Sequence, residues 1–348
     1  MFRVRAFQVA HGDSLLVSYG RDDRPYHLLV DGGPSRSWST LRPLLKSALV
    51  GERLRLEALV VTHYDRDHIQ GVIELLEHIP DWLEIGEVWF NGYHHLSPSD
   101  LLGPREGDTL TQLIRRCGLS WNTSFRNQKN GQSGAAILQS SNAVSLPGGL
   151  EVSVLSPDQY GLTALGRHWT DPASPPVDSE SAPDDLLGPR DEWPPKRFNL
   201  NGGSDFVSDT SIPNRSSIAL LLTFDNKRVL LAADAFADVI KRGLAISLPG
   251  KEPIDLLKVS HHGSKGNTNK SLLDGLGCKR FLISTSGEIH KHPDHALIER
   301  LVARYDNPEI FFNYSQDWPG NWKVRPANWP DFQTRYPQEG EQFVDVLL

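Results

Sequence analysis

Short apolar runs that end abruptly in histidine or aspartate recur along this chain, and they restrict its fold more than any other feature. Three such runs cover residues 56–62, 228–233 and 254–260, and the residues that follow them are His63, Asp234 and His261. Alternating apolar runs of this length predict buried strands. Helical patterns lie between the strands, and α/β folds place their chemistry at strand ends. The pattern therefore predicts a layered α/β protein.

The rest of the chain continues this alternation. Apolar periodicity predicts further strands at residues 3–9, 14–18, 27–31, 217–224 and 281–285. Helical spacing predicts helices at residues 40–49, 69–79 and 294–304. Asp225 and Asn226 separate two apolar runs, which is typical of a β-hairpin turn.

Composition limits the class of protein. Hydrophobic residues make up 39% of the 348 residues and charged residues 23%, which indicates a globular chain rather than a disordered one. No apolar run approaches the roughly 18 residues of a membrane span, and the first residues do not resemble a signal peptide. We therefore expect a cytoplasmic protein with no membrane partner.

Cysteine content and net charge narrow the choice of cofactor and partner. Cys117 and Cys278 are too few for a disulfide framework and lack neighbours at zinc-finger spacing, so any metal must be held by histidine and carboxylate. The net charge of -7 creates no general attraction for nucleic acid. Contact with phosphate would depend on local basic residues, for which the candidates are Lys258, Lys265 and Lys270.

The densest group of metal-ligand types is the stretch THYDRDH at residues 62–68. His63, Asp65, Asp67 and His68 follow a predicted strand, and a tight turn brings side chains at this spacing together. Clustered imidazoles and carboxylates make little structural sense without a cation, although a solvated loop of mixed charge is the plain alternative. A metal site is the better interpretation.

Two later strand ends add ligand types. Asp234 alone could cap a helix, and the pair His261 and His262 alone is only suggestive. Three strand ends that each offer histidine or aspartate favour one shared metal site. Asp31, which precedes two glycines, is expected to support the loop at 63–68 rather than to bind metal.

Two other stretches have more than one interpretation. The histidines at residues 290–295 could form a solvated helix N-terminus or could face a substrate. Residues 168–213 are rich in Pro, Asp and Ser, and we expect a long surface insertion that is a mobile loop rather than a lid.

Sequence blocks along most of the chain resemble the metallo-β-lactamase fold superfamily, and within it the hydrolase domain of ComEC-type competence proteins. The blocks are VAHGDSLLV, LLVDGG, VTHYDRDHIQGV, NRSSIALLL, LLAADA, LLKVSHHGSKGNTN and KHPDHALIERL. Asp65 replaces the superfamily's middle histidine, as in the ComEC-like group. The histidine of the superfamily's third motif has no counterpart, and Asn214 or Ser217 occupies that neighbourhood. The membrane channel domains of competence proteins do not occur here, so we expect a free-standing relative.

This resemblance implies the fold and the domain organisation. The implied fold is α/β, an αββα four-layer sandwich of two mixed sheets flanked by helices. The chain is then expected to form one domain, 1–348. Its parts are a first half at 1–150, the insertion at 168–213 and a second half at 214–348.

The resemblance also implies a site with two divalent metal ions. One ion would lie at His63 and Asp65 and the other at Asp67, His68 and His261, with Asp234 bridging. The mixed oxygen and nitrogen ligands suit Zn or Mn and leave Mg open. The other implied roles are catalytic for Asp67, His262 and His292, and substrate-binding for Ser264, Lys265, Asn214, Ser217 and His295.

A pair of such ions suits phosphodiester cleavage. We expect a metal-dependent phosphodiesterase that is a nuclease acting on DNA, with nucleic acid or another phosphodiester as its partner. The net charge and the insertion leave open a hydrolase of a small phosphodiester, such as a cyclic nucleotide or a phosphocholine ester. The nine tryptophans leave open a metal-stabilised, non-catalytic interaction module with a protein partner.

Overall fold

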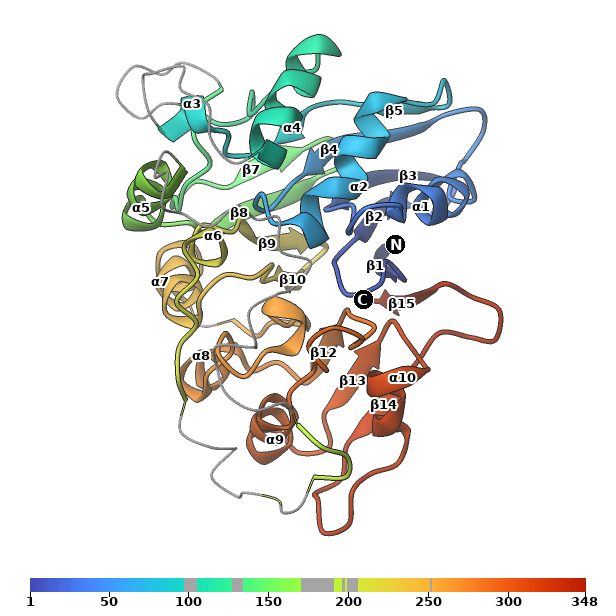
Figure 1. Cartoon of the computed structure of the whole chain (residues 1–348), viewed down its shortest axis with the longest axis vertical. Coiled ribbons are helices and arrows are strands. Elements are labelled where there is room, and N and C mark those ends of the chain that lie inside the picture. Colours follow the sequence, from blue (N-terminus) through green and yellow to red (C-terminus); the bar gives the residue numbers. More distant parts are fainter. Residues whose placement is uncertain (97–104, 127–133, 170–190, 196–197, 199–205, 251) are drawn as a thin grey trace.

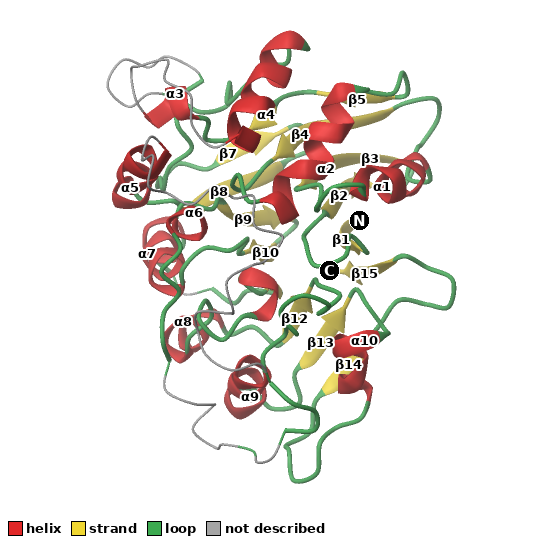
Figure 2. Cartoon of the chain, in the orientation of Figure 1, coloured by secondary structure: helices red, strands yellow, loops and turns green. Residues whose placement is uncertain are grey.

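Two sheets lie face to face, and helices cover the outer face of each (Figure 1 and Figure 2). The computed structural model describes residues 1–96, 105–126, 134–169, 191–195, 198, 206–250 and 252–348. Each sheet contains both parallel and antiparallel strand pairs. The predicted fold class, an α/β sandwich of two mixed sheets flanked by helices, is confirmed.

The first sheet joins the two ends of the chain. Its strand order is β15, β1, β2, β3, β4, β5, and β6 also pairs with β4. The strands are β1 (Phe2–Phe7), β2 (Leu15–Arg21), β3 (Arg24–Val30), β4 (Leu54–Val60), β5 (Leu83–Ile85), β6 (Val88–Trp89) and β15 (Phe343–Leu347). Because β15 pairs antiparallel with β1, the N- and C-termini lie close together (Figure 1). No sequence pattern indicated this pairing.

The second sheet carries the later part of the chain. Its strand order is β14, β13, β12, β11, β10, β9, β8, β7. The strands are β7 (Val144–Leu146), β8 (Leu150–Ser156), β9 (Ala219–Phe224), β10 (Lys227–Leu231), β11 (Leu256–Lys258), β12 (Arg280–Ile283), β13 (Glu309–Phe312) and β14 (Gln333–Arg335). The predicted hairpin is confirmed: β9 and β10 are antiparallel, and Asp225 and Asn226 have φ of 48° and 60°. These angles fit a two-residue hairpin turn.

Strand alternation explains the layers. In β9, Leu220 and Leu222 lie between the two sheets, whereas Ala219 and Leu221 pack toward the helices. Successive side chains of a strand point to opposite faces of its sheet. Central strands covered on both faces therefore read as continuous apolar runs, which is the pattern seen in the sequence.

The helices pack on the outer faces through their apolar sides. On the first sheet these are α1 (Ser37–Lys46), α2 (Arg66–Glu77), α4 (Arg105–Arg116) and α5 (Gln159–Trp169). On the second sheet they are α7 (Ala237–Ser247), α8 (Lys270–Leu276) and α9 (His295–Arg304). Short turns are α3 (Tyr93–Leu96), α6 (Ile212–Arg215), α10 (Asp317–Gly320), η1 (His261–Gly263) and η2 (Asn321–Lys323). Within the described part of the chain, no helix is long and apolar enough to cross a membrane.

The expected insertion at 168–213 contributes three aromatic side chains to the cores, although other described residues of the stretch, such as Val207, are exposed. Trp169 ends α5 and is buried in the core of the first half. Trp193 and Phe198 pack against the core of the second half, where their rings contact Trp322 and Trp329. These three aromatic side chains find apolar partners, and they anchor the stretch to both halves of the chain. The rest of the stretch lies outside the described residues.

Candidate metal centre

The loop after β4 and the first turn of α2 together present four of the predicted ligands. His63 lies three residues after Val60, the last residue of β4, and Asp65 occupies the position before the first turn of α2, with extended backbone angles. The backbone N–H of His68 donates to the Asp65 carbonyl and closes that turn. Asp67 and His68 therefore sit on the first turn of the helix, beside the strand end that carries His63.

Two parallel strands of the second sheet bring the other ligands to the same place. β10 and β11 are parallel neighbours, so the segments that follow them meet at one edge of the sheet. Asp234 follows β10, and the backbone N–H of His261 donates to Ala233, 2.9 Å away. Ala233, His261 and His262 all have positive φ, of 47°, 50° and 53°. Left-handed backbone at residues other than glycine is concentrated at functional sites.

Asp234 lies at the centre of the group and is buried. Four imidazole nitrogens surround its Oδ2: Nε2 of His68 at 3.4 Å, of His261 and His262 at 3.8 Å each, and of His63 at 3.9 Å. Like-charged imidazolium groups repel one another, so an arrangement with all four Nε2 atoms facing one carboxylate needs a compensating group. A cation shared by these ligands is such a group.

The two aspartates of the loop lie on different sides of this centre. Asp67 Oδ2 is 3.1 Å from His262 Nε2 and 3.6 Å from His68 Nε2. Asp65 Oδ2 is 3.4 Å from His63 Nε2. The ligand types therefore form one group at His63 and Asp65 and another at Asp67, His68 and His262.

The composition of the second group differs from the expectation. The resemblance implied that His261 binds the same ion as Asp67 and His68, but the structure places His262 beside Asp67. The two histidines follow the same strand, and the positive φ of both turns the chain sharply, so successive side chains point in different directions. His261 meets Asp234 from a different side. Which of two adjacent residues faces a site at such a turn cannot be read from their order in the sequence.

Each imidazole is anchored through its other nitrogen. The Nδ1 partners are Thr62 Oγ1 for His63 (3.0 Å), Asp31 Oδ2 for His68 (2.8 Å), Asn267 Oδ1 for His261 (3.0 Å) and the Ser284 carbonyl for His262 (3.0 Å). A bond that engages Nδ1 leaves the Nε2 lone pair directed at the centre, as in known metal sites. The four rings are thus oriented as ligands.

Asp31 supports the centre in the way the sequence predicted, without entering it. Its carboxylate accepts hydrogen bonds from the backbone N–H and the hydroxyl of Thr62, each at 2.8 Å, and faces Nδ1 of His68. One buried carboxylate therefore fixes both the end of β4 and one imidazole.

Four buried polar atoms of the centre have no hydrogen-bond partner among the described residues: His63 Nε2, His68 Nε2, Asp234 Oδ1 and Asp13 Oδ1. Unsatisfied buried polar atoms are rare in folded proteins because each costs about 1 to 3 kcal/mol. Here they converge with the carboxylates, and oxygen and imidazole donors together suit a divalent metal ion. The residues present therefore fit the metal that the sequence implied.

The carboxylates of the centre raise the pKa values of the histidines that face them. Burial lowers the pKa of His261 and His262, but neighbouring carboxylates outweigh this effect. Asp234 and Asp209 raise the pKa of His261 to about 10, and Asp13 and Asp234 raise that of His262 to about 9. Protons on the imidazoles therefore balance the carboxylates when no metal is bound, and a divalent cation would compete for the same positions.

The predicted catalytic and phosphate-contacting residues lie at different distances from the centre. His292 is buried, and its ring centroid lies 5.8 Å from that of His261. Ser264 is also buried, and the backbone N–H of Lys265 donates to Asp294. The ring of His292 thus lies beside that of His261, whereas the Ser264 hydroxyl accepts a hydrogen bond from the backbone N–H of Gly266 at 3.3 Å.

The predicted substrate-binding residues separate into two sets. Asn214 is buried, and its Nδ2 donates to Asp209 and lies 3.5 Å from His261 Nδ1. Ser217 is buried as well. His295, in contrast, packs among tryptophan rings, with its ring centroid 5.4 Å from that of Trp318. The fold therefore surrounds His295 with aromatic side chains, away from the group around Asp234.

Lys258, which was expected to contact phosphate, is not on the surface. Its side chain is fully buried and forms an ion pair with Asp13, whose carboxylate also lies 3.5 Å from Nδ1 of His262. A lysine in this position cannot contact phosphate in a substrate. The ion pair lowers the pKa of Asp13 against the effect of burial.

Three residues at the centre were missed as site residues: Asp13, Asp209 and Asn267. Asp13, His68, Asp234 and His262 offer ligand atoms that all lie within 4.8 Å of one another. Because Asp13 faces Nδ1 of His262 and Lys258, we assign it a supporting role. The HGD stretch at 11–13 was a signal for Asp13, whereas nothing in the polar insertion marked Asp209.

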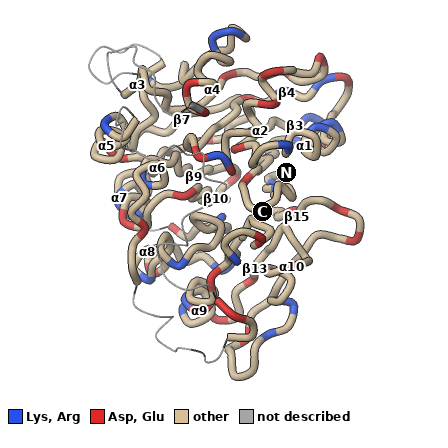
Figure 3. The backbone as a smooth tube through the Cα atoms, viewed as in Figure 1, with Lys and Arg blue, Asp and Glu red and all other residues tan. Residues whose placement is uncertain are grey.

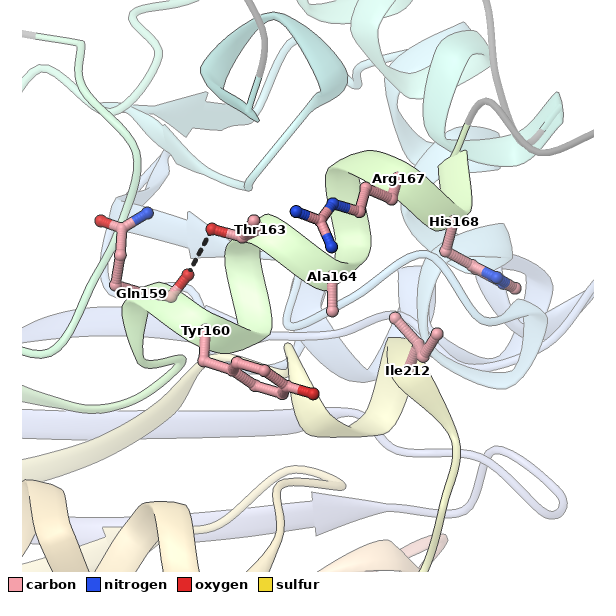
Figure 4. A pocket seen from close by; sticks show the side chains of 7 residues that line it. All are labelled: Gln159, Tyr160, Thr163, Ala164, Arg167, His168 and Ile212. Atoms are coloured by element: carbon pink, nitrogen blue, oxygen red, sulfur yellow. Dashed lines mark hydrogen bonds between the residues drawn. The ribbon is translucent and has the colours of Figure 1, made fainter.

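A separate pocket lies on α5 and α6. Its volume is 570 Å³, and the side chains that line it are Gln159, Tyr160, Thr163, Ala164, Arg167, His168 and Ile212 (Figure 4). None of these residues belongs to the group around Asp234. The pocket and the metal centre are therefore lined by different residues.

Comparisons with known proteins agree with the fold. A family model of the metallo-beta-lactamase superfamily matches residues 14–88, which include the loop at 63–68. No curated protein matches the sequence significantly. Residues 14–88 are therefore similar to the metallo-beta-lactamase superfamily model, and they contain the four predicted ligands of the loop at 63–68.

Two solved structures are similar to the chain. The metallo-beta-lactamase fold protein YhfI from Bacillus subtilis is 11% identical, over 99% of this chain and 100% of that protein, with a TM-score of 0.41. A mutant of the CmlA beta-hydroxylase is 12% identical, over 100% of this chain and 54% of that protein, with a TM-score of 0.40. This chain thus spans about half the length of the CmlA structure. Both TM-scores are too low to support an argument about function.

Proposed function

We propose that this chain, which carries a metallo-beta-lactamase superfamily domain, is a metal-dependent phosphodiesterase that cleaves DNA. The observation that supports the proposal is the convergence of four imidazole Nε2 atoms on Asp234, with Asp65 and Asp67 on either side. A carboxylate at the centre of two ligand groups is suited to hold two cations at once.

The residues divide into two sets of ligands. His63 and Asp65 would hold one ion and Asp67, His68 and His262 the other, with Asp234 shared between them. His261 would complete the coordination from its own side of Asp234. When bound, the two ions supply Lewis-acid polarisation of a phosphoryl oxygen and lower the pKa of water. The mixture of carboxylate and imidazole favours Zn or Mn and allows Mg.

The other residues of the site have roles of their own. Asp31, Thr62 and Ser284 hold the imidazoles in the orientation that a ligand needs. His292, which lies at the edge of the centre, would hold the proton that the leaving oxygen takes up. Ser264 would donate a hydrogen bond to a phosphate oxygen of the substrate.

The choice of DNA rests on the resemblance of the sequence blocks to ComEC-type hydrolase domains. The described surface favours a second candidate, a small phosphodiester. Lys and Arg positions are interspersed with Asp and Glu positions along the described backbone (Figure 3). Lys258, one of three lysines expected near the site, is buried in an ion pair. A long anionic duplex has few cations to contact, whereas a small substrate needs only the centre itself.

The test compares substrates under identical conditions. The purified protein, loaded with Mn or Zn, is incubated with single-stranded DNA, duplex DNA, bis(p-nitrophenyl) phosphate and cyclic nucleotides. We expect cleavage of DNA that Asp67→Ala and Asp234→Asn abolish and that Asp306→Asn, at an exposed carboxylate, leaves unchanged. Turnover of cyclic nucleotides with intact DNA would support the second candidate. A folded, metal-loaded protein that cleaves none of these substrates would refute both and favour an interaction module.

A further inference from the structure

The carboxylate of Asp209 occupies a position beside the metal centre that none of the family-like sequence blocks supplies. Its Oδ2 accepts hydrogen bonds from Nδ2 of Asn214 at 2.8 Å and of Asn267 at 2.9 Å. The same oxygen lies 3.3 Å from Nδ1 of His261. One carboxylate therefore meets both amides and the imidazole.

These contacts determine how Asn267 is turned. Because its Nδ2 donates to Asp209 and to the Asp234 carbonyl, its Oδ1 is left to face His261 Nδ1 at 3.0 Å. An amide oxygen at that position accepts a hydrogen bond from the Nδ1–H, which keeps the proton on Nδ1 and leaves the Nε2 lone pair for a metal. Were the amide turned over, its NH₂ group would face Nδ1 and favour the opposite tautomer.

The segment that carries Asp209 is fixed in place from several sides. The backbone N–H of Asp209 donates to the Gly266 carbonyl, and its Oδ1 accepts from the backbone N–H of Ser211. Nearby, the ring of Phe206 lies against the guanidinium of Arg300, 5.2 Å from the ring centroid. Asp209 is thus hydrogen-bonded to the loop that follows η1.

We propose that Asp209 is a positioning residue that orients His261 for metal binding, both directly and by fixing the amide of Asn267. This inference rests on the proposed metal-dependent function and extends it to a residue outside the family-like blocks. Asn214 donates to Asp209 and so helps to hold its carboxylate toward His261. Both residues hold a ligand rather than act as one.

Metal affinity is the first readout. In competition titrations with Zn, we expect Asp209→Asn to weaken the binding of one ion by about 10- to 100-fold and to leave the other unchanged, which is typical of lost support to a ligand. Asp306→Asn makes the same chemical change at an exposed carboxylate and is the matched control. Thermal unfolding of the metal-free variants separates a loss of folding from a loss of affinity.

A second variant distinguishes positioning from general structural support. Asn267→Asp, added to Asp209→Asn, returns a carboxylate to His261 Nδ1 but loses the hydrogen bond to the Asp234 carbonyl, so we expect it to restore part of the lost affinity. Long-range ¹H–¹⁵N NMR of the Zn-loaded proteins should show the proton on Nδ1 of His261 in the wild type and in the double variant. If Asp209→Asn does not fold, the zinc affinity and the NMR signal of the folded double variant test the inference.

The outcomes separate the two proposals. A wild-type protein that takes up no ion refutes the proposed function and this inference with it. A wild type that takes up two ions, with affinities that Asp209→Asn does not change, refutes the inference alone. A double variant that folds but gains no affinity also refutes it.

Discussion

Replacing Asp31 with asparagine changes one buried charge in the support of the metal centre and almost nothing in its shape. Asp31 accepts three hydrogen bonds of 2.8 Å, two from Thr62 and one from Nδ1 of His68. The amide oxygen of asparagine can still accept from the Thr62 backbone. Its NH₂ group then faces the Thr62 hydroxyl, which can rotate and accept, and Nδ1 of His68, which must give up its proton.

The expected loss of stability follows from the loss of one hydrogen bond, between Asp31 and Nδ1 of His68. A hydrogen bond to a charged group contributes about 1.5 to 3 kcal/mol, so the metal-free Asp31→Asn protein should be less stable by about that amount. For the metal, the wrong tautomer of His68 places a proton on Nε2, and we expect about 10- to 100-fold weaker binding. That loss corresponds to about 1.4 to 2.7 kcal/mol.

The loss of stability should also depend on pH. The carboxylates of Asp234, Asp67 and Asp31 outweigh burial and raise the pKa of His68 well above its usual value. A raised folded-state pKa contributes stability that is fully present below the unfolded pKa of about 6.5 and is lost as pH rises through the folded pKa. The difference between wild type and Asp31→Asn should therefore be largest below about pH 6.5 and shrink in alkaline buffer.

The assay is urea unfolding of the metal-free proteins at acidic and alkaline pH, together with competition titration with Zn. Asp23→Asn is the matched control, since Asp23 is an exposed carboxylate bonded to Arg21. Equal metal affinity in wild type and Asp31→Asn would refute the argument that Asp31 sets the tautomer of His68. Equal stability would refute the value assigned to the buried bond.

Three further predictions test other parts of the structure. Uptake of metal near pH 7 should release about three protons, because the pKa values of three ligating imidazoles are raised, to about 10 for His261, to about 9 for His262 and well above its usual value for His68. Calorimetry in buffers of different ionisation enthalpy measures the release, and no release would contradict these directions. Gly71→Ala should lower the free energy of unfolding by about 1 to 3 kcal/mol or more, measured by thermal unfolding, because its Cβ would lie 1.9 Å from the Gly32 carbonyl oxygen. Gly275→Ala, whose Cβ would meet nothing within 4 Å, should not be destabilised. Lys258→Met should destabilise the protein by about 3 to 5 kcal/mol in urea unfolding, because it leaves Asp13 buried and unpaired. Adding Asp13→Asn should recover much of the loss. An effect as small as that of Lys227→Met, at an exposed ion pair, would count against a buried ion pair.

The strands and the 63–68 loop could be predicted because the information is local. Alternating apolar residues report burial on one or both faces of a strand, and the ligand types of the loop lie within six residues, so one turn suffices to gather them. The strand-end positions of Asp234 and His261 were predictable for the same reason. Each follows an apolar run whose end must reach the edge of a sheet.

The tertiary structure alone decided the contacts between distant segments and the direction of side chains at sharp turns. His262 rather than His261 stands beside Asp67 because the backbone after β11 turns through positive φ, which no periodicity reports. Lys258 faces Asp13, and Asp209 reaches His261, only because two sheets and a packed segment bring remote residues together. Local patterns specify which face of an element is buried, but the partners it meets depend on how the whole chain packs.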